Sequence, residues 1–176
     1  DAFSTDFKHS GPKGKYLGLV GTGRMFGVMM LSQKALRMGF SNETDKKNVG
    51  IHEFAHLVDL ADGQMDGLPK ELWDKPYTMP WINMMRQNIS RIKKGHSDVD
   101  SYGATSPIEF FAVTTEYFFQ RPDLLKEKHP ELYKVLKRFF RQDPARGFKN
   151  MVGIRHDIGN NAPCHCGSGK KYKRCC

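Results

Sequence analysis

No cysteine precedes Cys164, and all four cysteines of the chain lie between that residue and Cys176. A small secreted domain held by disulfides would spread its cysteines across the fold. The cysteine-free body must therefore depend on a hydrophobic core, and 176 residues with 39% hydrophobic side chains supply material for about one domain. The four clustered cysteines predict one local metal site.

Long apolar runs are also absent, since no stretch approaches the roughly 18 apolar residues of a transmembrane helix. We therefore expect no membrane partner and, without a visible signal peptide, a cytoplasmic protein. Acidic side chains are fewer than basic ones, 19 against 28, which gives a formal charge of +9. That surplus suits nucleic acid, an acidic partner or an ordinary solvated surface. Apart from this charge only the cluster KKYKR favours nucleic acid, so we do not expect it as a partner.

The sequence HEFAH at residues 52–56 has the HExxH pattern, on a helix predicted over residues 44–61. Residues four apart lie about 40° apart around a helix, so both imidazoles can bind one Zn²⁺. Glu53, about 100° from His52, is placed to act as the base for a zinc-activated water. Asp59 shares the face of His52 and is a candidate to accept the N–H of a ligating imidazole.

A catalytic zinc usually has three protein ligands and an open position. Glu109 and Glu116 are seven residues apart on the apolar helix predicted over residues 106–119, and so share a face. The spacing leaves Glu109 evenly balanced between metal ligation and a capping box with the N–H of Ser106. Glu116 is also a candidate to hold an imidazole. We expect the downstream histidines to be solvated: His96, His129 and His156.

With these motifs the chain resembles the zinc peptidase family of Mlc titration factor A. The similarity covers residues 18–144 and rests on NVGIHEFAHLVDLADG, DSYGATSPIEFFAVTTEYFFQRPDLL and HPELYKVLKRFFRQDP. It implies that Glu109 is the third ligand beside His52 and His56. The family tyrosine seven residues earlier falls on Tyr102, whose phenol would stabilise an oxyanion.

The same resemblance implies a function. It indicates a zinc-dependent peptidase that hydrolyses a peptide or protein substrate, with a glutamate as general base. The alternative is a regulatory or adaptor protein that binds a transcriptional repressor or another protein, with catalysis secondary or absent.

Residues 161–176, NAPCHCGSGKKYKRCC, resemble the SEC-C zinc motif. Its CxC and CC pairs bracket a Gly-Ser-Gly turn, so four sulfurs can surround one zinc in a closed, structural site. The resemblance makes the basic cluster of this motif a candidate docking point for a protein partner. His165 is a weaker ligand candidate than the cysteines. The expected ligands are Cys164, Cys166, Cys175 and Cys176.

We therefore expect an α+β fold with two zinc ions, one catalytic and one structural. A mostly helical zincin-type metallopeptidase domain with a small N-terminal sheet is predicted over residues 1–147. A linker over 148–160 and the zinc-bound motif over 161–176 follow. A strand is predicted over residues 25–31 beside the cleft, and the glycines before it are interpreted as a turn, since their spacing does not match a phosphate loop. The other helices are predicted over residues 78–94, 122–128 and 130–142.

Overall fold

The computed structural model describes residues 17–21, 23–41, 46–70 and 75–146, apart from the side chains of 75–77, and the single residues 161, 171 and 174. The chain divides into two units, residues 1–145 and 146–176, and each is taken by itself. The predicted linker and the four cysteines lie outside the described residues. No helix within the described part of the chain is long and apolar enough to cross a membrane.

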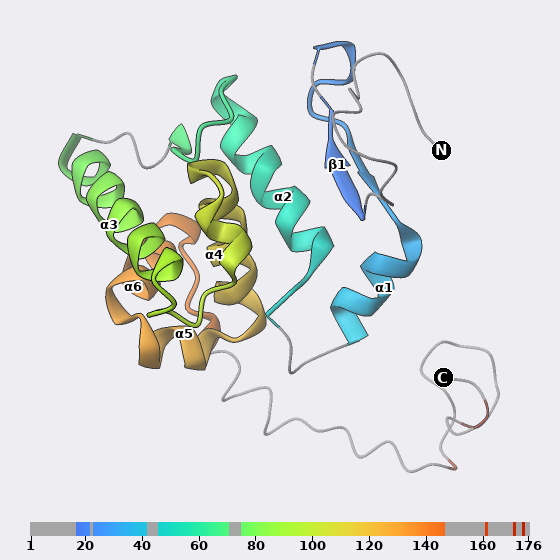
Figure 1. Cartoon of the computed structure of the whole chain (residues 1–176). Helices are drawn as coiled ribbons and strands as arrows, with labels where there is room; N and C mark the ends of the chain where they lie inside the picture. The colour runs from blue at the N-terminus through green and yellow to red at the C-terminus, as the bar shows by residue number, and fades with distance from the viewer. Residues whose placement is uncertain are drawn as a thin grey trace. The chain divides into compact units, whose positions relative to one another are not determined.

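The first unit is mostly helical and has one small antiparallel sheet near its N-terminal end (Figure 1), in agreement with the expected α+β class. The strands are β1 (Gly18–Val20) and β2 (Met29–Leu31), with Leu19 opposite Met30. The helices are α1 (Gln33–Ser41), α2 (Val49–Asp59), α3 (Lys75–Lys93), α4 (Pro107–Gln120), α5 (Pro122–Lys128) and α6 (Pro130–Phe140). The 3₁₀ turns are η1 (Gly23–Met25), η2 (Leu60–Asp62) and η4 (Ser101–Ala104).

The prediction for the N-terminal third was partly wrong. The strand expected over residues 25–31 begins only at Met29, because η1 and a left-handed Gly27 (φ 75°) precede it. β1 lies where the sequence predicted a turn, and α1 was not predicted. Ser32, which directly follows the predicted strand, accepts the Ala35 N–H through its Oγ at 3.4 Å at the start of α1.

The helix boundaries follow local caps. α2 begins five residues later than predicted, since Asn48 is extended and its side chain accepts the Ile51 N–H at 3.2 Å. α4 begins where Ser106-Pro107 predicted, and α5 has its predicted bounds. α6 ends at Phe140, two residues early, because Arg141 adopts the left-handed conformation (φ 52°).

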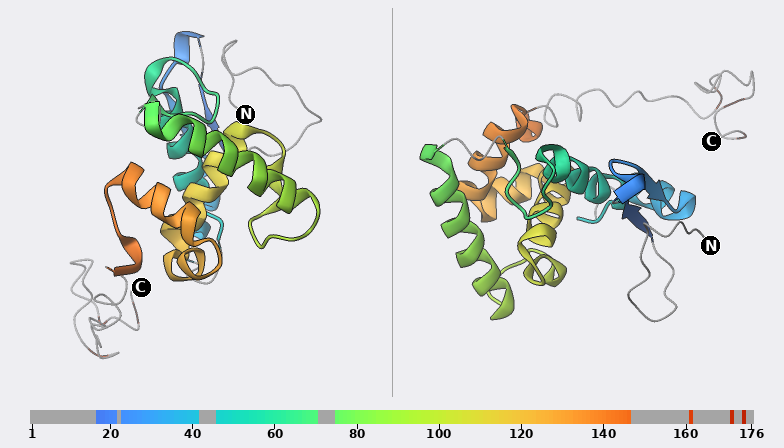
Figure 2. Two further views of the ribbon diagram at one scale, coloured as in Figure 1. Left: turned by 90° about the vertical axis from the view of Figure 1, so that its left-hand side faces the viewer. Right: turned by 90° about the horizontal axis from the view of Figure 1, so that it is seen from above.

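α4 is the central helix of this unit and packs against α2, α3, α5 and α6 (Figure 2). Every residue from Phe110 to Phe118 is buried. Trp81 of α3 is fully buried, with its ring centroid 5.9 Å from Phe110 and 6.2 Å from Phe111. Each such aromatic side chain contributes about 1.5–3 kcal/mol through removal from water. The position of α4, and of the buried side chains that it carries, is therefore closely constrained.

Asp98, between α3 and η4, joins several elements of the unit. Its Oδ2 lies 2.7 Å from Lys46 Nζ and accepts the Tyr117 hydroxyl at 2.7 Å, while Oδ1 lies 2.6 Å from His129 Nε2. Burial opposes ionisation, but the hydrogen bonds from Lys46, His129 and Tyr117 hold the pKa of Asp98 well below its ordinary value. The expectation that His129 is solvated was wrong, since that ring is buried against Asp98.

Asp98→Asn should lower the free energy of unfolding near neutral pH by about 2 kcal/mol, because hydrogen bonds to charged groups each contribute about 1.5–3 kcal/mol. The folded-state pKa of Asp98 is lowered, so its contribution is present above the unfolded value of about 4 and is lost as the pH falls further. Urea unfolding at about pH 7 and about pH 3 measures the difference, with the exposed Glu127→Gln as control. An equal loss at both pH values would contradict this assignment.

Candidate metal centre

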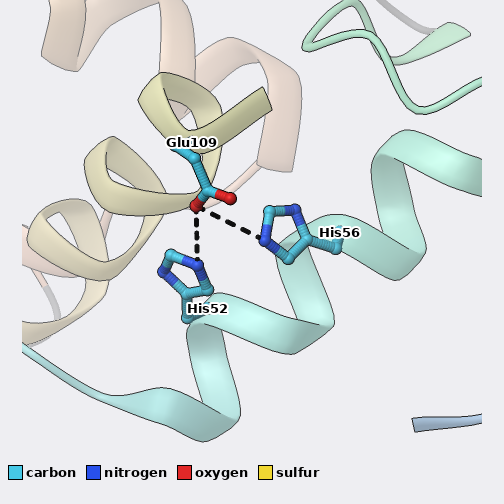
Figure 3. A group of neighbouring side chains, drawn as sticks. All are labelled: His52, His56 and Glu109. Carbon is cyan, nitrogen blue, oxygen red and sulfur yellow. Dashed lines mark ion pairs between the residues drawn. The ribbon is translucent and has the colours of Figure 1, made fainter. Parts of the chain in front are cut away.

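Two imidazoles of α2 and one carboxylate of α4 converge (Figure 3). His52 and His56 lie one turn apart on the same face of α2, with ring centroids separated by 4.7 Å. Glu109 Oε2 is 3.0 Å from His52 Nε2 and 3.7 Å from His56 Nε2. One ligand atom from each residue lies within 4.8 Å of the others. The structure thus brings together the three residues expected to bind the metal.

The chemistry of these donors fits a metal ion. Glu109 Oε2 is buried and receives no hydrogen bond of suitable geometry from the described residues, although two imidazole nitrogens approach it. His56 Nδ1 is buried and unpaired in the same sense. Leaving a buried polar group unpaired costs about 1–3 kcal/mol. Two imidazole nitrogens and one carboxylate oxygen are a common protein ligand set for a catalytic zinc, with a fourth position open.

Of the predicted capping box between Ser106 and Glu109, the structure shows only the half in which the Ser106 side chain accepts a backbone N–H. The hydroxyl of Ser106 accepts the backbone N–H of Glu109 at 3.1 Å, which caps α4. The carboxylate of Glu109 faces His52 and His56 instead of turning back along the helix (Figure 3). Its side chain is therefore available to a metal while its backbone takes part in the cap.

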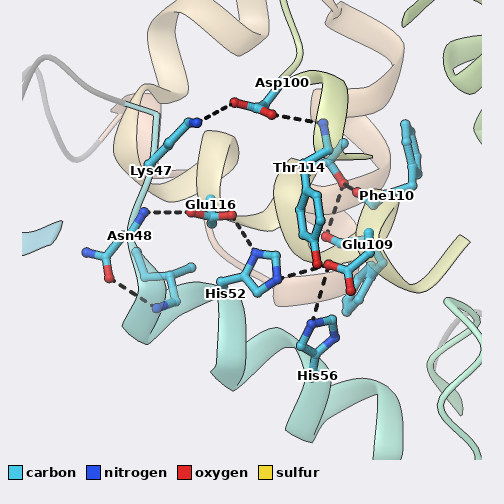
Figure 4. A network of polar contacts seen from close by, with 12 residues as sticks. Lys47, Asn48, His52, His56, Asp100, Glu109, Phe110, Thr114 and Glu116 are labelled. Carbon is cyan, nitrogen blue, oxygen red and sulfur yellow. Dashed lines mark hydrogen bonds and ion pairs between the residues drawn. The ribbon is translucent and has the colours of Figure 1, made fainter. Parts of the chain in front are cut away.

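Glu116 lies two turns further along α4 and holds His52 from the other side (Figure 4). Its Oε1 is 2.6 Å from His52 Nδ1, and its Oε2 accepts the backbone N–H of Asn48 at 2.6 Å. A carboxylate at Nδ1 orients the ring and leaves Nε2 facing Glu109. Of the two candidates for this contact, Asp59 and Glu116, the structure selects Glu116.

Asp59 instead fixes the turn at Gly67, which packs against the first residues of α4. This fully buried residue accepts the Gly67 N–H at 2.9 Å, and the Gly67 carbonyl accepts the Trp81 indole N–H at 3.0 Å. Gly67 has a φ of 79°, and a Cβ there would overlap the backbone of Pro107. Asp59 thereby holds the turn against which the first residues of α4, including Glu109, are packed. The sequence pattern did not reveal this role.

A cavity of about 380 Å³ adjoins His52. Glu53 lines it and is buried, and Tyr102 of η4 lines it with 51% of its surface exposed. Gly18 of β1 also lines it, and a Cβ at that position would overlap the side chain of Glu53. Glycine therefore permits the close approach of β1. The strand beside the cavity is β1, whereas the sequence had predicted the one that includes β2.

The cavity changes the proton affinities of its groups. Burial, assisted by the charges of Glu109 and Glu116, raises the pKa of Glu53 to about 7 against the opposing effect of His52. A carboxyl with such a pKa is suited to proton transfer near neutral pH. Burial and the adjacent carboxylate of Glu109, to which it is hydrogen-bonded, raise the pKa of Tyr102, so the phenol stays protonated. Although burial opposes it, contact with Glu109 and Glu116 raises the pKa of His52 to about 10 in the metal-free arrangement.

The family model described as glucose-regulated metallo-peptidase M90 matches residues 8–141, which is most of the chain. The chain belongs to this M90 metallopeptidase family. A second model, the SEC-C motif, matches residues 161–176, where the four cysteines lie. Both resemblances drawn from the sequence are thereby confirmed.

This M90 chain is also similar to individual proteins, some named Mlc titration factor A and one uncharacterised. Mlc titration factor A of Pectobacterium atrosepticum is 30% identical over 162 residues, which cover 84% of this chain and 59% of that protein. Mlc titration factor A of Edwardsiella ictaluri is 36% identical over 106 residues, 56% of this chain and 40% of that protein. An uncharacterised Synechocystis protein is 33% identical over 125 residues, which cover 67% of this chain and 44% of that protein. The chain spans about half the length of the curated relatives that it matches.

Glu116→Gln should weaken zinc binding at the His52 site by about 10–100-fold, because a neutral amide has one acceptor oxygen for the two groups, the Asn48 N–H and His52 Nδ1, that the carboxylate contacts, and lacks its charge. Titration of the full chain with a competing chelator measures the affinity for zinc. One of the two expected zinc sites should show the lower affinity. Glu131→Gln is the control, since that carboxylate is exposed and, among the described residues, pairs with Lys134 on the surface of the same helix. Unchanged zinc affinity in a folded Glu116→Gln chain would show that this contact does not support the metal.

Proposed function

We propose that this M90 chain is a zinc-dependent peptidase of the zincin type that hydrolyses peptide bonds. The observation that carries the proposal is the convergence of His52, His56 and Glu109 beside a cavity that also contains Glu53 and Tyr102. When bound there, Zn²⁺ supplies a Lewis acid that polarises the scissile carbonyl and lowers the pKa of water. The three converging residues hold the ion.

Glu53 and Tyr102 would transfer the proton and stabilise the developing negative charge. Glu53 takes a proton from the attacking water and returns it to the leaving amine, a role that its buried position beside the cavity favours. Tyr102 stays protonated and donates a hydrogen bond to the oxyanion that develops at the scissile carbonyl. Its exposure places the phenol where a bound peptide can reach it. Binding alone would require neither residue.

We further propose that the chain is organised as a catalytic domain over residues 1–147, a linker over 148–160 and a zinc-bound motif over 161–176. The match of the last segment to the SEC-C motif supports a second ion held by its four cysteines. A closed four-sulfur site stabilises its own loop but has no open position for water. Its basic cluster would then serve to dock a protein partner.

Glu53→Gln should lower kcat on a peptide substrate by about 10²–10⁴-fold, since the amide cannot act as a general base. Zinc content and the far-ultraviolet circular dichroism spectrum should stay unchanged, because Glu53 does not belong to the converging ligand set. Steady-state kinetics on a mixed peptide library, with metal analysis of both proteins, measures this. Full turnover in the zinc-loaded variant would exclude the mechanism.

The chain in which Cys164→Ser and Cys175→Ser are combined should bind about one zinc, where the unaltered chain binds about two. Cleavage of short peptides should continue, since a closed site contributes no hydrolysis. Elemental analysis beside a peptide-cleavage assay measures both quantities. Loss of cleavage with retention of one zinc would show that the motif supports the catalytic site, contrary to the proposed organisation.

A second candidate function is regulatory binding of a protein. It is favoured by the name of two of the relatives, which says that they titrate Mlc. On this alternative the metal centre would stabilise a binding surface, and hydrolysis would be secondary or absent. The Glu53→Gln variant separates the two functions, because it should still bind the protein partner while it loses peptide hydrolysis.

A further inference from the structure

A second hollow, of about 470 Å³, lies along a different face of α2. Phe54, which lines it, follows His52 by two residues and so lies about 200° from that imidazole around the helix. We call this hollow the apolar groove. Its apolar lining comes from β2, α1, α2, α4 and α6 and includes Met29, Leu36, Phe40, Phe54, Phe119 and Phe140.

The walls of the apolar groove are held in place by specific contacts. The side-chain amide of Gln120 on α4 donates to the Gly39 carbonyl of α1 at 2.8 Å. A Cβ at Gly50 of α2 would overlap Leu36 of α1, so glycine permits the two helices to approach closely. α1 is therefore fixed against both α2 and α4, and the groove between them is a built feature.

Large aromatic side chains remain exposed in this groove. Phe40 is 66% exposed and Phe54 is 57% exposed within the described part of the chain. Contiguous exposed apolar surface of this kind marks interaction sites, because leaving it in water costs free energy that a partner can recover. Neither aromatic residue belongs to the converging metal ligands.

Among the described residues that adjoin the lining in sequence, the exposed charged side chains are both basic. Exposed Arg37 follows the lining residue Leu36, and exposed Arg141 follows the lining residue Phe140. α1 carries no acidic residue. The acid that follows the lining segment at the end of α6, Asp143, is already in a salt bridge. An acidic partner therefore complements this rim.

We propose that the apolar groove binds an acidic segment of a partner protein. Two or more large apolar side chains of the segment contact Phe40 and Phe54, and its carboxylates lie against Arg37 and Arg141. Aromatic anchors surrounded by complementary charge are the usual source of affinity and specificity in such contacts. The proposal goes beyond hydrolysis and does not depend on it, since the groove shares no residue with the lining of the cavity beside His52.

Selection from a random peptide library on the full chain tests this directly. Enriched peptides should combine large apolar residues with Asp or Glu, and their affinity should be measured by fluorescence polarisation. Phe40→Asp and Arg37→Glu should each weaken binding by about tenfold or more. Met38→Asp and Lys34→Glu are matched controls, because both residues are exposed on α1 and outside the lining, and should change affinity less than about twofold.

Three results would overturn the proposal. The first is enrichment of basic or uncharged peptides. The second is binding that Phe40→Asp leaves unchanged in a folded chain. The third is a wild-type dimer that Phe40→Asp converts to a monomer in sedimentation, since a second copy would then occupy the groove. Hydrolysis by Phe40→Asp and Arg37→Glu, measured in parallel, should stay at the wild-type level, so failure of this proposal is distinguished from failure of the peptidase mechanism.

Discussion

The arrangement of the candidate metal centre depends on the carboxylate of Glu116. One of its oxygens accepts the backbone N–H of Asn48 at the start of α2, and the other lies against Nδ1 of His52. A buried carboxylate is costly unless its oxygens are hydrogen-bonded. Because both contacts lie on α2, satisfying Glu116 also sets how α2 lies on α4 and which way the first imidazole points.

Contacts at the start of α4 and two turns further along it hold Glu109 in position. α4 is the buried centre of the unit, and its first residues are packed against the Gly67 turn that Asp59 holds. Its later turn is tied to α2 through Glu116. A metal site requires side chains positioned to within about 0.5 Å. Glu109, located between these two contacts, is positioned by core packing and by the hydrogen-bonded carboxylates of Asp59 and Glu116.

The N-terminal hairpin borders both hollows of α2. β1 approaches Glu53 closely through Gly18 and lines the cavity, while β2 lines the apolar groove. α2 thus presents its histidines to α4 and its Phe54 to the groove. A helix with 3.6 residues per turn can serve two separate surfaces in this way, because residues two apart point in nearly opposite directions.

Features that depend on neighbouring residues could be predicted from the sequence alone. The HExxH spacing predicted two imidazoles on one helix face, and Ser106-Pro107 predicted where α4 begins, since periodicity and capping act within a few residues. The SEC-C motif could likewise be recognised from the spacing of its four cysteines. α1 and β1 were missed because such short elements depend on packing against α2 more than on their own pattern.

Only the tertiary structure decided which carboxylate reaches which group. In the sequence Glu109 and Glu116 share one face of a helix, and Asp59 was an equal candidate to hold a histidine. The packing of α4 on α2 directs Glu109 to both imidazoles at Nε2, Glu116 to Nδ1 of His52 and Asp59 away to Gly67. Contacts between other elements bury His129 against Asp98, which lies 31 residues earlier in the sequence. Contacts between residues distant in sequence depend on how helices pack, and spacing within one helix carries no information about that.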